Sequence, residues 1–79
     1  MLINTSNPSQ MKKLYNKILK NKSCRIFEDS EGCFLTAFID PDNGELVLQK
    51  EINENFRVEQ LIFNSNGYQV GQIFTTVEI

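Results

Sequence analysis

A short acidic segment in the middle of the chain contains the residue types of a calcium-binding loop. Asp40, Asp42 and Asn43 precede Gly44, and Glu51 follows Asp40 by eleven residues. An EF-hand loop takes oxygen ligands from positions 1, 3 and 5, needs glycine at position 6 and glutamate at position 12, and lies between two helices. Counted from Asp40, the glycine stands at position 5, and the flanking residues are typical of strands. The spacing therefore argues against a metal site.

The same segment fits a turn between two strands. The Asn-Gly pair at 43–44 lies between alternating apolar runs, which is a strong signal for a β-hairpin. Pro41 presets a turn dihedral, and the Asp40 side chain can bond the backbone two residues on. Asp40, Asp42 and Glu45 then become acidic turn residues that we expect to contact a basic site on a partner protein, as phosphates would.

The two cysteines, Cys24 and Cys33, could form a disulfide or bind a metal ion. If the strands on either side of "DSEG" pair so that Glu28 faces Cys33, Cys24 faces Ala37 and the two sulfurs lie about 13 Å apart along the sheet. A disulfide needs Cα atoms within about 7 Å, and two cysteines without histidine make a poor zinc site. The spacing favours two reduced thiols that serve as small core residues and leaves an intermolecular disulfide open.

The remaining chemistry argues against an enzyme. The chain has no histidine, which removes the commonest general base and the commonest metal ligand at neutral pH. Serine and threonine occur without a base to activate them, and there is no glycine-rich phosphate loop. We expect no catalytic residue, no metal and no cofactor.

Charge is distributed unevenly along the chain. The first 25 residues hold six basic residues and no acid, whereas the rest holds ten acids and two basic residues, for a net charge of -2. Lys13, Lys17 and Lys20 lie on one face of a predicted helix and could contact phosphates. The pI near 5.0 and the lack of aromatic residues among the basic ones favour a solvated helix face instead.

An N-terminal helix is the clearest element. Asn7 is a credible N-cap, Pro8 suits the first helical position, and Gln10 stands where a capping-box partner would. An apolar stripe at helical spacing follows it. Its members are Met11, Leu14, Tyr15, Ile18 and Leu19.

Strands are predicted at about 24–28 and 33–39, in "ELVLQKEI", and from 68 to the end of the sequence, with Gly71 at a bulge. The segment 56–64 is ambiguous. As a helix it would have a left-handed glycine at its C-terminal end, and as a strand it would end in the hairpin turn "NSNG". Phe56 and Phe63 fall on the wrong side of the helical wheel, so we favour a strand.

Aromatic residues suggest a surface that needs a partner. The strand at 33–39 is apolar on both faces, with Phe34 and Phe38 on one of them, and one helix can cover only one face of a sheet. The last strand also carries Phe74, and we expect it to lie at a sheet edge with unpaired backbone groups. We expect a homodimer or an exposed aromatic patch that forms the partner interface, with these three phenylalanines as contributors.

The sequence thus predicts one compact α+β domain over residues 1–79, with an N-terminal helix packed on an antiparallel sheet of four to five strands. No apolar run is long enough to cross a bilayer, and we expect the protein to be cytoplasmic. In general character alone it is similar to small phage or mobile-element proteins that block a larger host machine, anti-CRISPR proteins among them. The leading hypothesis is a protein-binding module that acts as a stoichiometric inhibitor or adaptor. The alternative is a nucleic-acid accessory protein that uses the lysines of the helix.

Overall fold

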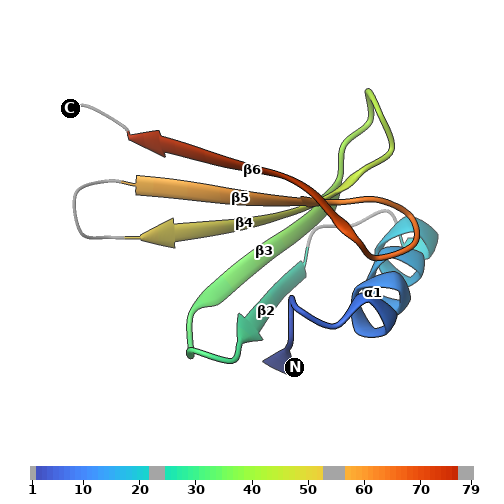
Figure 1. Ribbon diagram of the computed structural model, residues 1–79, viewed down its shortest axis with the longest axis horizontal. Coiled ribbons are helices and arrows are strands. Elements are labelled where there is room, and N and C mark those ends of the chain that lie inside the picture. The colour runs from blue at the N-terminus through green and yellow to red at the C-terminus, as the bar shows by residue number, and fades with distance from the viewer. Residues whose placement is uncertain (1, 22–24, 53–56, 77–79) are drawn as a thin grey trace.

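One helix and six strands make up the part of the chain that the structure, a computed structural model, describes: residues 2–21, 25–52 and 57–76 (Figure 1). In chain order the elements are β1 (Leu2–Ile3), α1 (Pro8–Asn21), β2 (Arg25–Asp29), β3 (Phe34–Ile39), β4 (Leu46–Ile52), β5 (Arg57–Phe63) and β6 (Gln69–Thr76). No helix among these residues is long and apolar enough to span a membrane.

All six strands form one sheet in the order of the sequence, β1-β2-β3-β4-β5-β6. The pairs from β2 to β6 are antiparallel, and β1 runs parallel to β2, with α1 as the connection between them. The α+β class with one N-terminal helix is confirmed. The prediction of a purely antiparallel sheet of four to five strands is wrong, because β1 has only two residues and such a strand leaves no periodic pattern in the sequence.

Helix α1 begins as the sequence predicts but with a different partner for Gln10. The Asn7 side-chain oxygen accepts a hydrogen bond from the Gln10 backbone N–H at 3.2 Å, which is the N-cap contact. The Gln10 side chain accepts from the backbone N–H of Asn4, not from that of the cap residue. The glutamine therefore ties the connection after β1 to the first turn of the helix.

The core lies between α1 and one face of the sheet. Met11, Leu14 and Ile18 of the helix are buried, whereas Leu19 is 46% exposed. Tyr15 is half-buried, and its hydroxyl donates a hydrogen bond of 2.9 Å to the Gly44 carbonyl oxygen, which fastens the helix to the turn between β3 and β4. The sheet contributes Ile3, Phe27, Leu35, Ala37, Leu46, Leu48 and Phe63.

The segment 57–63 is a strand, so the helix that the sequence left open at 56–64 is wrong. Position 56 lies outside the described residues. The strand pairs with β4 on one side and β6 on the other along its whole length. This backbone pairing stabilises the strand more than the predicted caps would stabilise a helix. The β5–β6 ladder shifts register between Ile62, which pairs with Gly71, and Phe63, which pairs with Gln69. The predicted bulge is therefore present in β6, and its extra residue directly precedes Gly71.

The pairing of β2 with β3 differs by one residue from the register that we expected. Glu28 pairs with Phe34 and Arg25 with Ala37, whereas the sequence analysis paired Glu28 with Cys33. The reason is a tight turn in which the Asp29 backbone N–H donates to the Cys33 carbonyl oxygen at 2.9 Å. The other cysteine, at position 24, lies outside the described residues. Cys33 is free and half-buried.

Candidate functional site

The sheet has one face that packs on α1 and one that does not. Side chains alternate along each strand, so Leu35 and Ala37 point toward the helix while Phe34 points away from it. The helix lies on one side of the sheet in Figure 1, and the far ends of β4, β5 and β6 extend away from it. We call the side chains on the opposite side the uncovered face. By strand register they are Ile26, Glu28, Phe34, Thr36, Phe38, Val47, Gln49, Glu51, Val58, Gln60, Ile62, Ile73 and Thr75.

One end of the uncovered face is packed within the sheet itself. Phe38, Val47 and Ile62 form one row across three strands. Val47 is only 4% exposed although no helix covers it, because its two half-buried neighbours flank it. Gly71 ends the row opposite Ile62, and a β-carbon there would make ordinary van der Waals contact with the Ile62 side chain. This row gives the face a rigid apolar base.

The other end of the uncovered face is open to solvent. Ile26 is 72% exposed and Phe34 is 70% exposed. Both line a shallow hollow with Thr36, Gln49 and Glu51. Ile26 and Phe34 are diagonal neighbours across the β2–β3 ladder, and adjoining exposed apolar side chains are found at interaction sites.

Carboxylates border the open end. Glu28 pairs directly with Phe34 across the β2–β3 ladder, and Glu51 lines the same hollow. The described residues of the uncovered face include no lysine or arginine. The surface therefore has apolar side chains toward both ends, a polar row of Thr36, Gln49 and Gln60 between them, and negative charge where Phe34 is most exposed.

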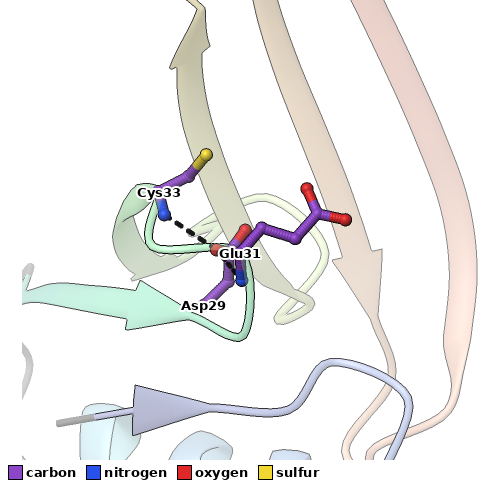
Figure 2. Close-up of side chains that lie close together, drawn as sticks. All are labelled: Asp29, Glu31 and Cys33. Carbon is purple, nitrogen blue, oxygen red and sulfur yellow. Dashed lines mark hydrogen bonds between the residues drawn. The ribbon is translucent and has the colours of Figure 1, made fainter.

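A polar network fixes the turn that precedes Phe34 (Figure 2). The Asp29 side-chain Oδ1 accepts hydrogen bonds from the backbone N–H groups of Glu31 and Cys33, both at 2.9 Å. Its other oxygen, Oδ2, lies 3.5 Å from Nζ of Lys50 on β4, the strand on the far side of β3. The Asp29 carboxylate thus closes the β2–β3 turn and links it to β4. These contacts hold the beginning of β3, where Phe34 lies.

The protonation of this network follows from its contacts. Partial burial alone would raise the pKa of Asp29, but the hydrogen bonds from Cys33 and Glu31 and the Lys50 ammonium together hold that pKa below its usual value. Burial alone would likewise lower the pKa of Lys50, and the nearby side chains of Asp29 and Cys33 raise it instead. Both side chains are mostly shielded, with 14% of Asp29 and 19% of Lys50 exposed. The pair is charged at neutral pH.

The same turn brings together three side chains of types that bind metals. Ligand atoms of Asp29, Glu31 and Cys33 lie within 4.8 Å of one another. Both oxygens of Asp29 already have partners, and one of these partners is the Lys50 ammonium, a cation that another cation would have to displace. The arrangement serves the hairpin turn, and we derive no metal chemistry from it.

The three phenylalanines singled out in the sequence do not form one patch. Phe34 and Phe38 share the uncovered face, four residues apart, or about 13 Å along β3. Phe74 pairs with Glu59, which pairs with Lys50 on the side of the sheet where α1 packs. It is 64% exposed because it lies on β6, beyond the reach of the helix. The contribution of each to a partner interface stays a prediction.

The acidic turn between β3 and β4 is formed as the sequence predicts, but it lies at the other end of β3 from Phe34. Asp40 Oδ1 accepts from the backbone N–H of Asp42, and Asn43 Oδ1 accepts from that of Glu45, both at 2.9 Å. Six residues, or about 20 Å of strand, separate Asp40 from Phe34. The turn acids and Phe34 therefore border different ends of the uncovered face.

Lys13, Lys17 and Lys20 are exposed on α1, on the opposite side of the sheet from the uncovered face. Sequence reasoning missed Ile26, Glu28 and Glu51 as members of the surface. The signal for them was the strict alternation of strand residues, which places Ile26 and Glu28 on the side opposite Phe27, and Glu51 on the side opposite Lys50.

No protein-family model matches the chain, and neither a curated protein nor a solved structure matches it.

Proposed function

We propose that the protein is a non-enzymatic protein-binding module that binds its partner through the uncovered face, as a stoichiometric inhibitor or adaptor of a larger assembly. The observation that carries the proposal is the exposure of Ile26 and Phe34, 72% and 70%, on a sheet face that the helix does not cover. Aromatic side chains such as that of Phe34 are enriched at the centres of protein interfaces, where a few buried residues supply most of the binding energy.

The size of the face fits this role. It runs across five strands, from β2 to β6. Four strand spacings of about 4.8 Å give it a width of about 19 Å, the scale of the centre of a standard interface, which has about 800 Å² on each partner. The apolar row of Phe38, Val47 and Ile62 requires no rearrangement on binding, because it is already packed in the free chain.

Charge specifies the chemistry of the partner. Glu28 and Glu51 lie beside Phe34, and the turn acids Asp40, Asp42 and Glu45 lie at the far end of the same strand. A complementary surface would have apolar side chains opposite Phe34 and opposite the Phe38 row, with lysine or arginine opposite the acids at each end. Such charge complementarity speeds encounter and makes association weaken as salt is added. Basic sites of this kind occur in proteins that bind nucleic acids, which agrees with the inhibitor hypothesis from the sequence.

A photo-crosslinking amino acid at position 34 tests the proposal. We expect crosslinks from position 34 to one protein, and 1:1 binding when that protein is purified and mixed with the chain. The matched control places the same amino acid at position 19, which is also exposed but lies on α1. Equal crosslinking from both positions, or a captured protein that does not bind when purified, would contradict the proposal.

The alternative function, contact with nucleic-acid phosphates through Lys13, Lys17 and Lys20, is supported by the exposure of all three side chains on one helix. It requires a different surface from the uncovered face, so the two functions can be separated by substitution.

A further inference from the structure

Strand β6 forms an edge of the sheet in the part of the chain that the structure describes. It pairs with β5 over Gln69–Thr76, and none of the other strands described in 2–21, 25–52 and 57–76 lies on its other side. Because a strand bonds each neighbour through alternate residues, every second residue of β6 directs its backbone N–H and C=O groups away from the sheet. The other edge, β1, is two residues long and offers little to pair with.

The edge lacks most of the features that normally prevent strands from pairing between molecules. In natural proteins these features are charged residues, especially lysine, proline, β-bulges and short strands. The eight residues of β6 include neither a charged residue nor a proline. The register shift near Gly71 affects only the beginning of the strand, and the remainder pairs regularly with β5.

Exposed apolar side chains flank this edge on both faces of the sheet. Ile73 is 46% exposed on the uncovered face, and Phe74 is 64% exposed on the opposite face. A strand added beside β6 would therefore bury apolar surface on both sides of the sheet while it satisfied the outward backbone groups.

We propose that β6 pairs antiparallel with β6 of a second copy of the chain, about a two-fold axis close to Ile73 and Phe74. A second copy fits this edge because two identical uncharged strands meet without like-charge repulsion, and a two-fold axis makes their hydrogen-bonding groups complementary. In this arrangement the Phe74 side chains of the two copies lie side by side on one face. The two sheets become one continuous sheet.

The dimer goes beyond the proposed function because it would combine two binding surfaces in one assembly. An axis perpendicular to the sheet keeps the uncovered faces of both copies on the same side, so the dimer presents two binding surfaces in one direction. Two linked sites raise the effective concentration for a partner that is itself repeated or dimeric. The dimer depends on the edge of β6 around Phe74, whereas the binding function depends on Ile26 and Phe34, so either can fail without the other.

Charge pairs at position 74 test the dimer. Sedimentation equilibrium of the unaltered chain from about 1 µM to about 1 mM should show a monomer–dimer equilibrium. Phe74→Lys alone and Phe74→Glu alone should each raise the dissociation constant at least tenfold, because identical charges then face each other. An equimolar mixture of the two variants should restore the dimer.

Phe34→Lys is the matched control, since this residue is equally exposed but lies on an inner strand, and it should dimerise normally. A monomer at the highest concentration, a dimer that survives both Phe74 variants, a mixture that stays monomeric, or loss of the dimer in Phe34→Lys would each overturn the proposal.

Hydrogen exchange on the unaltered chain gives a second measurement that does not depend on the folding of variants. Protection of alternate β6 amides should increase with protein concentration, and unchanged protection would contradict edge pairing.

Discussion

Phe34 and Leu35 are consecutive residues of β3, yet 70% of Phe34 is exposed and only 1% of Leu35 is exposed. The two side chains point to opposite sides of a sheet that has a helix on one side only. Leu35 belongs to the core, and Phe34 belongs to the uncovered face. The energetic roles of two large apolar residues that are adjacent in sequence should therefore differ.

Alanine substitution should separate these roles. Leu35→Ala removes buried methyl groups and leaves a cavity, so we expect the free energy of unfolding to fall by about 2 to 5 kcal/mol. Phe34→Ala removes mainly solvent-exposed surface and should lower it by about 1 kcal/mol or less. Urea unfolding followed by circular dichroism measures both values. Similar losses in the two variants would mean that Phe34 is covered within the monomer.

The Asp29–Lys50 contact predicts how stability changes in acid. The pKa of Asp29 is lower in the folded chain than its usual value, so its stabilising effect is complete above about pH 4 and is lost as pH falls through the folded pKa. Asp29→Asn should lower the free energy of unfolding by about 1 kcal/mol at pH 7, because it removes charge-assisted hydrogen bonds. The difference between the two proteins should shrink below about pH 4.

Glu31→Gln is the control for that experiment. Glu31 lies 3.8 Å from Lys50, but its side chain is 77% exposed, so its ion pair should contribute less than about 0.5 kcal/mol at pH 7. If Asp29→Asn and Glu31→Gln have equal effects on urea unfolding at pH 7, the turn is not held by Asp29 as described.

Gly67 should be essential for the packing of the β5–β6 turn on α1. It has a φ of +88°, and a β-carbon there would stand 2.7 Å from the Lys12 backbone nitrogen and even closer to the Pro8 carbonyl oxygen. Gly67→Ala should lower stability by about 2 to 5 kcal/mol, from backbone strain together with the clash. Gly44→Ala is matched, because its φ is +73° with open space around it, and should lose only about 1 to 2 kcal/mol. Equal melting temperatures for the two variants would contradict the close approach.

Charge reversal on the helix should leave partner binding intact. Lys13, Lys17 and Lys20 lie on the other side of the sheet from the uncovered face, so changing all three to glutamate should alter affinity for a protein partner less than threefold at physiological salt, about 0.6 kcal/mol. In an electrophoretic mobility-shift assay at about 50 mM salt we expect no retardation of DNA or RNA by the unaltered chain. Retardation that disappears in the triple variant would favour the nucleic-acid alternative.

The elements of this fold were predictable where local patterns are strong. The cap at Asn7, the stripe that buries Met11, Leu14 and Ile18, and the Asn-Gly turn at 43–44 all follow from local chemistry. β1 was missed because two residues carry no period. The register of β2 against β3 was off by one because it depends on how Asp29 closes the turn, a contact that no propensity specifies.

The candidate site was less predictable than the fold. Alternation correctly separated Phe34 and Phe38 from Leu35 and Ala37, and the sequence correctly suggested that one helix leaves a face bare. Phe74 could not be assigned to a face, because its side depends on the pairing of β4, β5 and β6 over long separations in sequence. Tertiary pairing, not local composition, decides which aromatic residues share a surface.

The affinity of a purified partner for two matched phenylalanine variants tests the central claim most directly. Phe34 and Phe74 are the same residue type with similar exposure, 70% and 64%, on opposite faces of the sheet. By isothermal titration calorimetry, at a dilution where the chain is monomeric, we expect Phe34→Ala to weaken binding at least tenfold, about 1.4 kcal/mol, and Phe74→Ala to leave it within about twofold. Equal losses in both variants, or a loss confined to Phe74→Ala, would contradict the assignment of the uncovered face as the binding surface.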